Sequence, residues 1–300
     1  MDICKIQELL GIDQTGEYSP ITIAALKNFQ VKNNIPATGI LNTDTEKALM
    51  LLDSPKSNHN LEGITDISHT SDLSELKILQ KPLKSSEYYA DKQNKVEYIF
   101  IHHTAGNDNP YAVVDDWNSD SRGRIGTQFV IGGKNINGSD KYDGTILQCI
   151  PDLHWASHLG SYKEHGINLN MHKNSIGIEL CNFGQLTQKG SKFYTYTNTE
   201  VPSTSVYPLK FRGYDYWHSY SEKQLEALYQ LLINLGNKYN IDLSKGLPSM
   251  IPKSGIYAFD YNISAVQGNI KGILTHTNVR KDKVDCYPHI NLINMLKRFV

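Results

Sequence analysis

The 300-residue sequence lacks several features that would place a protein in a broad class at once. It has only four cysteines, at positions 4, 149, 181 and 286, and they are widely separated. Small secreted domains instead carry dense cysteines that form a disulfide framework. We therefore expect free thiols and synthesis in the reducing cytoplasm.

Long hydrophobic runs and an excess of one charge are also missing. No stretch approaches the ~20 apolar residues of a membrane-spanning helix, and no basic segment leads into an apolar run at the N-terminus, as in a signal peptide. We expect a soluble chain without membrane insertion. The 30 Lys and Arg nearly balance the 31 Asp and Glu, for a formal net charge of −1, which argues against nucleic acid as a partner.

Changes in composition indicate two domains joined by a linker. Residues 1–53 show helical spacing of apolar residues between glycine-containing turns, which predicts three short helices, the last from Thr43 to Leu52. Asp53 to about Glu75 is rich in Ser, Asn and Pro and has little apolar periodicity, as in a linker. We assign residues 54–80 to the linker and residues 81–300 to the larger domain.

From about Lys95 onward, strand-like apolar runs alternate with helical stretches, which predicts an α/β domain. The clearest helix runs from Ser221 to Tyr239, where Ser221 and Gln224 form a capping-box pair ahead of a leucine stripe. Asn182 to Tyr220 is rich in Tyr, Thr and Ser. It predicts either a hairpin or surface loop, or an aromatic sugar-binding rim. The expected strands are 96–101, 127–131, 145–150, 176–180 and 273–275.

Two of the apolar runs lead directly into histidine. His102 follows residues 98–101, and His276 follows residues 272–275. Asp285 lies nine positions after His276, across a charged loop that can curl back. Two histidines and one carboxylate, with a fourth position open to water, are a recognised catalytic zinc set. The sequence therefore predicts a hydrolytic zinc site at these three residues.

Glu179 and Lys283 are two further candidates for the hydrolytic site. Glu179 lies inside an apolar strand, where an unpaired carboxylate is costly to bury, so we expect it to face a cleft and to accept a proton from water. Lys283 precedes Asp285 by two residues, so both side chains can point to one side of an extended loop. An ammonium there would stabilise an oxyanion. The alternatives are a surface glutamate on an edge strand and a solvated lysine.

These residues carry a resemblance to a known family. Residues 101–106, residues 174–180, and His276 with residues 283–288 resemble the motifs of zinc-dependent N-acetylmuramoyl-L-alanine amidases of type 2. The resemblance covers about Lys95 to Val300. It implies a mixed central sheet flanked by helices, as in the related peptidoglycan recognition proteins and phage endolysins. It also implies hydrolysis of the amide bond between N-acetylmuramic acid and L-alanine in peptidoglycan.

The resemblance assigns roles to single residues. Zn²⁺ is held by His102, His276 and Asp285, while Glu179 acts as general base on the zinc-activated water. Lys283 stabilises the transition state. The expected substrate contacts are His158, His103 and Thr104.

Two departures from the family pattern affect these assignments. The loop that leads to Asp285 is one residue shorter than in the commonest family form, so Cys286 competes as the third ligand. We favour Asp285 because the Lys-x-Asp register is shared. Residues 126–129 replace the Tyr-His that often precedes that strand, so no catalytic tyrosine is expected and proton transfer falls to Glu179.

Residues 4–52 resemble a second family, the small three-helix peptidoglycan-binding domain. The matching positions include Ile6-Gln7, Thr15-Gly16, Phe29-Gln30 and Thr38-Gly39. Such a domain would tether an amidase to its polymeric substrate and raise the local concentration of cleavable bonds. We expect a monomer without a signal peptide that reaches the cell wall through a holin or a secretion machine. The alternative is a non-catalytic protein that recognises peptidoglycan fragments.

Overall fold

The chain folds into two compact units, Met1–Leu76 and Lys77–Val300. The expected linker falls largely outside the residues that the computed structural model describes, and so do parts of the expected third helix. Within the described part of the chain, no helix is both long and apolar enough to cross a lipid bilayer. The described residues are 2–33, 35, 39, 41, 45–46, 48–50, 76–160 and 166–300.

The N-terminal unit contains helices α1 (Ile3–Leu9) and α2 (Pro20–Lys32), with further helical residues at 45–46 and 48–50. The Asp2 carboxylate caps α1 by accepting a hydrogen bond from the Lys5 amide at 2.8 Å. The apolar core is small, so the polar contacts inside this unit matter for its stability. Its fully buried members are Ile6, Leu26 and Leu49.

Two buried glutamines hold the turns of this unit in the same way. The Gln7 side chain donates to the Thr22 hydroxyl at 2.9 Å and accepts from the Gly16 amide at 3.0 Å. Gly16 has φ +71°, a left-handed conformation that glycine adopts without strain. The same two spacings, 15 and 9 residues, recur in the second half of the unit. There the matching residues are Gln30, Thr45 and Gly39.

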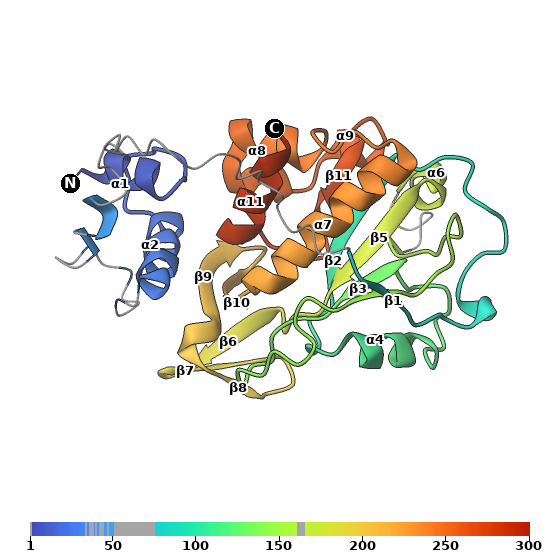
Figure 1. Cartoon of the computed structure of the whole chain (residues 1–300), viewed down its shortest axis with the longest axis horizontal. Coiled ribbons are helices and arrows are strands. Elements are labelled where there is room, and N and C mark those ends of the chain that lie inside the picture. The colour runs from blue at the N-terminus through green and yellow to red at the C-terminus, as the bar shows by residue number, and fades with distance from the viewer. Residues whose placement is uncertain are drawn as a thin grey trace, which may run out of the picture. The chain divides into compact units, whose positions relative to one another are not determined.

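The larger unit is organised around a six-stranded sheet with the order β1-β4-β3-β5-β2-β11, shown in Figure 1. Every neighbouring pair is parallel except β3 and β4, which confirms the predicted mixed sheet. All six residues of β2 are buried, as expected for a parallel strand covered on both faces. The strands are β1 (Ile78–Gln80), β2 (Tyr98–His103), β3 (Phe129–Ile131), β4 (Ile146–Gln148), β5 (Ser175–Leu180) and β11 (Gly272–Thr275).

Strand β1 lies inside the stretch that the sequence assigned to the linker. Ile78–Gln80 pairs in parallel with Ile146–Gln148, so the larger unit begins at Lys77. The larger unit thus begins four residues before the predicted boundary at residue 81. A strand of three residues is too short to show a period of its own, and it becomes visible only through its pairing with β4.

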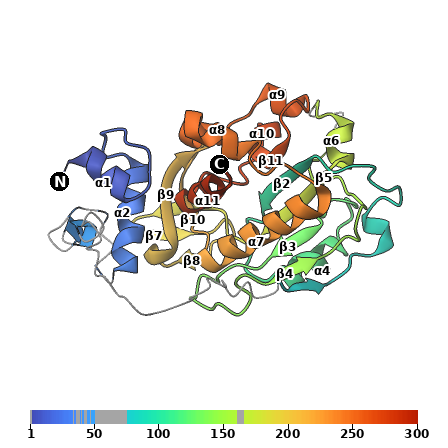
Figure 2. The ribbon, with the colours of Figure 1, turned by 45° about the horizontal axis from the view of Figure 1, so that its top comes forward.

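Helices flank the sheet, as Figures 1 and 2 show. Helix α4 (Pro110–Trp117) packs Val113 and Val114 against Val130 and Leu147. Helix α7 (Glu222–Tyr239) confirms the predicted leucine stripe and begins after Ser221, whose hydroxyl accepts from the Gln224 amide at 2.9 Å. The shorter helices are α6 (Leu169–Lys173), α8 (Leu247–Ser254), α9 (Ile263–Val266), α10 (His276–Val279) and α11 (Ile290–Leu296).

A second sheet of five strands forms the region from Asn182 to Tyr220, where the sequence predicted a hairpin or surface loop, or an aromatic sugar-binding rim. It is antiparallel with the order β8-β7-β6-β10-β9. Trp217 from this sheet stacks on Tyr287, which in turn stacks on Tyr220, so aromatic packing ties the sheet to the C-terminal segment. The strands are β6 (Gln185–Lys189), β7 (Lys192–Tyr194), β8 (Glu200–Val201), β9 (Val206–Phe211) and β10 (Tyr214–His218).

Candidate metal centre

Three neighbouring parallel strands bring candidate residues together at their carboxyl ends. Strand β2 lies between β11 and β5. Thr275 pairs with Ile101, so His276 and His102 follow side by side, while His102 itself pairs with Glu179. The carboxyl ends of neighbouring parallel strands meet at a common edge. This geometry explains why the ends of three distant apolar runs come together.

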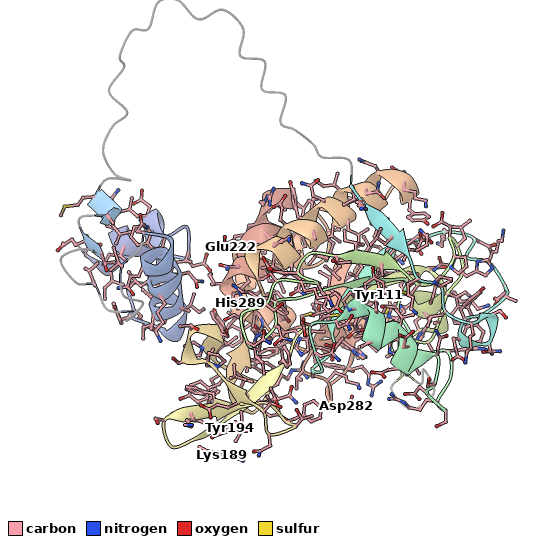
Figure 3. All side chains as sticks on the ribbon, turned by 60° about the horizontal axis from the view of Figure 1, so that its bottom comes forward. Tyr111, Lys189, Tyr194, Glu222, Asp282 and His289 are labelled. Carbon is pink, nitrogen blue, oxygen red and sulfur yellow. The ribbon has the colours of Figure 1, made fainter. Side chains whose placement is uncertain are left out.

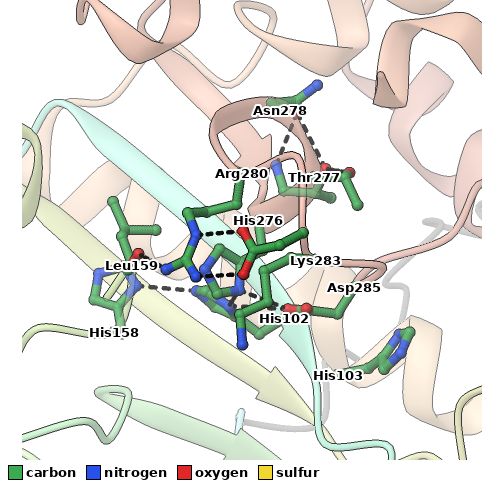
Figure 4. Close-up of polar contacts among 12 residues, drawn as sticks. His102, His103, His158, Leu159, His276, Thr277, Asn278, Arg280, Lys283 and Asp285 are labelled. Atoms are coloured by element: carbon green, nitrogen blue, oxygen red, sulfur yellow. Dashed lines mark hydrogen bonds and ion pairs between the residues drawn. The ribbon is translucent and has the colours of Figure 1, made fainter. Parts of the chain in front are cut away.

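The ring nitrogens of two histidines and one carboxylate oxygen converge within hydrogen-bond distance (Figure 4). His102 Nδ1 lies 3.2 Å from His276 Nδ1 and 3.2 Å from Asp285 Oδ2, and His276 Nδ1 lies 3.1 Å from that oxygen. Tetrahedral zinc with ligands at about 2.0–2.2 Å separates its ligand atoms by about 3.3–3.5 Å. The three atoms therefore fit a zinc ion with little adjustment.

The sequence left Cys286 as a competing third ligand. Its side chain is fully buried and interacts with the Tyr220 hydroxyl. Among the described residues, the cluster with metal-binding spacing consists of His102, His276 and Asp285. The donor set thus favours Asp285 over Cys286.

Burial and neighbouring charges shift the pKa values of three groups in the site, His102, Asp285 and Glu179. Desolvation lowers the pKa of His102 to about 4, so its imidazole is neutral and available as a ligand at neutral pH. Although burial acts to raise it, His276 and His102 hold the pKa of Asp285 well below its usual range. Desolvation, with a smaller contribution from Asp285, raises the pKa of Glu179 well above its usual value, against the opposing charge of Lys283. The pKa values of the two carboxyl groups, Asp285 and Glu179, are therefore shifted in opposite directions.

His158, predicted to contact substrate, lines the pocket and also lies directly behind a candidate ligand. Its Nδ1 is 3.0 Å from His102 Nε2, and its Nε2 is 2.9 Å from the Ser175 hydroxyl. Only 6% of the His158 surface is exposed. Its role toward substrate stays a prediction, while its contact with His102 was not predicted.

The other two predicted substrate contacts are His103, the last residue of β2, and Thr104, which follows it. His103 alternates to the opposite side of the strand from His102, and its Nδ1 lies 2.8 Å from the Tyr220 hydroxyl. The Thr104 hydroxyl donates to the Asn182 carbonyl at 3.0 Å and accepts from the Asn182 amide at 3.1 Å. Both residues line the pocket. Their hydrogen bonds to Tyr220 and Asn182 also hold their side chains in position within the folded domain.

A pocket of about 460 Å³ opens over the candidate metal centre and is lined by Glu179 and Lys283 among others. The buried Arg280 lines it and forms a two-pronged ion pair with Asp282, at 2.8 and 2.6 Å. Sequence reasoning missed Arg280, because a charged loop offers no signal that separates a buried arginine from solvated ones. Trp117 and Arg122 also line the pocket and were missed, while Gln185 and Tyr214 come from the Asn182–Tyr220 region in which the sequence suggested an aromatic rim.

Two family models match different parts of the chain. Residues 92–287 match the family model of N-acetylmuramoyl-L-alanine amidase, and residues 6–49 match that of a peptidoglycan binding domain. No curated protein matches.

Three solved structures resemble the chain at low identity. PlyL is 16% identical over 74% of this chain and 96% of its own, with a TM-score of 0.40. AmpD is 16% identical over 73% and 93%, with a TM-score of 0.39. The Ph2119 endolysin from the Thermus scotoductus bacteriophage is 14% identical over 74% and 98%, with a TM-score of 0.38. With TM-scores this low, the family assignment rests on the match to the family model.

Proposed function

Since the chain belongs to the N-acetylmuramoyl-L-alanine amidase family, we propose that His102, His276 and Asp285 hold a zinc ion at its active site. The protein is an amide hydrolase that acts on peptidoglycan. The observation that carries the zinc proposal is the convergence of three donor atoms at 3.1–3.2 Å. A bound zinc ion would supply Lewis acidity, which activates water and polarises the amide carbonyl.

Glu179 is the proposed general base. It pairs with His102 in the sheet and lines the pocket, so its carboxylate is within the site without being one of the three ligands. Its raised pKa suits a group that takes a proton from the attacking water and returns it to the leaving amine of L-alanine. The scissile bond is the proposed lactyl amide between N-acetylmuramic acid and L-alanine.

Lys283 is the proposed partner of the developing oxyanion. It lines the same pocket, two residues before Asp285 in the sequence. A positive charge held at the edge of a desolvated site stabilises negative charge on the carbonyl oxygen more strongly than it would in water. The lysine therefore needs a fixed position.

The N-terminal unit is the proposed anchor. Its match to a peptidoglycan binding domain supports a role in holding the enzyme on the insoluble polymer. The proposed domain limits are residues 1–53 for the anchor, 54–80 for the linker and 81–300 for the catalytic part, which lies within the compact unit Lys77–Val300. Further proposals are that the protein is a monomer and that it crosses the membrane through a holin or a secretion machine.

One assay tests the active-site proposal. Purified protein is incubated with peptidoglycan and the appearance of new L-alanine amino termini is measured, with and without a chelator. We expect release that the chelator abolishes and that added zinc restores, and we expect Glu179→Gln to lower the rate by about 10²–10⁴-fold while leaving zinc content unchanged. Release that persists in Glu179→Gln would exclude Glu179 as the base.

A further inference from the structure

Arg212 lies in the tight turn that joins β9 to β10, and its side chain reaches the loop that carries Lys283 and Asp285. Its guanidinium donates to the Thr277 carbonyl at 2.8 Å and to the Lys281 carbonyl at 2.8 Å. The same group donates to the carbonyls of Arg280 at 3.1 Å and Lys283 at 3.4 Å. One side chain from the second sheet thus contacts four backbone carbonyls of the loop between two proposed zinc ligands.

Each of these four carbonyls accepts a hydrogen bond from the Arg212 guanidinium. Among the described residues, none of them accepts another hydrogen bond. Beyond the short helix α10, the loop has no secondary structure, so its backbone is not paired in a ladder. The hydrogen bond to Lys281 is exposed and the other three are partly buried, so losing the guanidinium costs most at the three partly buried carbonyls. The arginine therefore joins four points of this backbone, beside the Arg280–Asp282 ion pair and the hydrogen bond from the Thr277 amide to the Asp285 carbonyl.

The conformation of the turn between β9 and β10 does not explain why residue 212 is an arginine. Arg212 and Gly213 have φ of +52° and +85°, the pattern of a two-residue type I′ hairpin turn. Such turns favour asparagine or glycine at the first position, because other side chains are strained in the left-handed region. An arginine at this position is unfavourable for the turn and is accounted for by its contacts with the loop.

The same hairpin also forms part of the pocket. Tyr214, two residues after Arg212, lines the pocket and is 36% exposed. Figure 3 shows Asp282 on the loop, and Lys189 and Tyr194 on the hairpin of β6 and β7 in the same sheet. The pocket wall at Tyr214 and the loop that carries Asp285 are thus connected through the turn at Arg212.

We propose that Arg212 is a positioning residue, which fixes the 277–283 backbone so that Lys283 and Asp285 keep their places in the site. The inference rests on the proposed zinc site for its consequence in catalysis. Its structural part, the ordering of the loop by Arg212, holds for the zinc-free protein and is tested there.

The experiment compares the full-length wild type with Arg212→Asn, Arg212→Lys and Lys210→Gln. Asparagine suits the turn better than arginine, so Arg212→Asn removes the contacts without weakening the hairpin. Lysine keeps the charge but lacks the fork that reaches several carbonyls at once. Lys210 is exposed on β9 two residues away, and Lys210→Gln controls for the loss of a positive charge.

Hydrogen–deuterium exchange is measured on the zinc-free proteins, followed by zinc affinity in competition with a chromogenic chelator. In Arg212→Asn we expect amides 277–285 to exchange about tenfold faster while β2 and β5 are unchanged, and zinc to bind about 10–100-fold more weakly. Arg212→Lys should lie between Arg212→Asn and the wild type, and Lys210→Gln should match the wild type. We also expect kcat on peptidoglycan to fall more than KM rises.

Unchanged exchange at residues 277–285 in Arg212→Asn would overturn the inference, and so would faster exchange throughout the central sheet, which would indicate general destabilisation. Failure of the wild type to bind zinc would instead refute the proposed metal site and leave the exchange result to decide the role of Arg212.

Discussion

His158 Nδ1 lies 3.0 Å from His102 Nε2, at the back of the proposed zinc site. The Ser175 hydroxyl donates to the His172 carbonyl at 3.2 Å, so it accepts from His158 Nε2, 2.9 Å away. A neutral His158 with its proton on Nε2 then accepts from His102 Nε2. The backbone carbonyl of His172 thus sets a tautomer of His102 in which Nδ1 keeps its lone pair free for a metal.

The first prediction tests this relay, the chain of hydrogen bonds that runs from the His172 carbonyl through Ser175 and His158 to His102. His158→Phe keeps an aromatic ring beside Phe100 but leaves His102 Nε2 without its acceptor. We expect zinc to bind about 10–100-fold more weakly, because partners that orient a ligating histidine contribute that much to affinity. The measurement is competition with a chromogenic chelator. His154→Phe, at a histidine that does not line the pocket, should bind zinc like the wild type, and equal affinities for both variants would refute the relay.

The second prediction concerns the glycine under His158. A Cβ atom added at Gly177 would lie 2.8 Å from Thr127 Cγ2 and 3.1 Å from His158 Cγ. We expect Gly177→Ala to displace the His158 ring, to destabilise the protein by about 1–3 kcal/mol through overpacking, and to weaken zinc binding. Gly106→Ala, whose Cβ would meet its nearest neighbour at an ordinary 3.7 Å, is the control. Denaturant unfolding and zinc titration of both variants decide the matter.

The third prediction uses the raised pKa of Glu179. Above the usual carboxyl pKa, the unfolded chain loses this proton while the folded chain retains it, so stability falls as pH rises through that window. Glu179→Gln removes the penalty. In zinc-free protein we expect this variant to melt at a higher temperature than the wild type at pH 7–8, with the difference shrinking toward pH 4. A difference that stays constant with pH would mean that the Glu179 pKa is not raised.

Much of the candidate site could be predicted because its residues follow directly from strand geometry. His102, His276 and Glu179 each end or interrupt an apolar run, and parallel strands bring such positions to one edge. Asp285 followed from its spacing to His276, because a loop of nine residues can return to the same point.

The rest depends on contacts between segments that are far apart in sequence. The fork of Arg212 meets carbonyls that lie 65–71 residues away, and His158 contacts His102 across 56 residues. Strand β1 becomes a strand only through its pairing with β4. No local pattern of residues encodes such pairings, so the second sheet, the linker boundary and the support of the loop became visible only in three dimensions.

The fourth prediction separates anchoring from catalysis. The Gln7 side chain makes hydrogen bonds with Thr15, Thr22, Gly16 and the Glu17 carbonyl inside a unit with a small core. Units of this size have only about 3–5 kcal/mol of stability, and each buried group left unpaired costs about 1–3 kcal/mol. We therefore expect Gln7→Ala to unfold the N-terminal unit and to abolish co-sedimentation with insoluble peptidoglycan.

Cleavage of a soluble muropeptide should stay at the wild-type rate in Gln7→Ala, because the proposed zinc ligands and their pocket lie wholly within Lys77–Val300. Gln14→Ala is the matched control, since Gln14 is an exposed glutamine of the same unit and should behave like the wild type in both assays. If Gln7→Ala still sediments with the polymer, the anchor is not the N-terminal unit. If it loses cleavage of the soluble substrate as well, anchoring and catalysis are not separable functions of the two units.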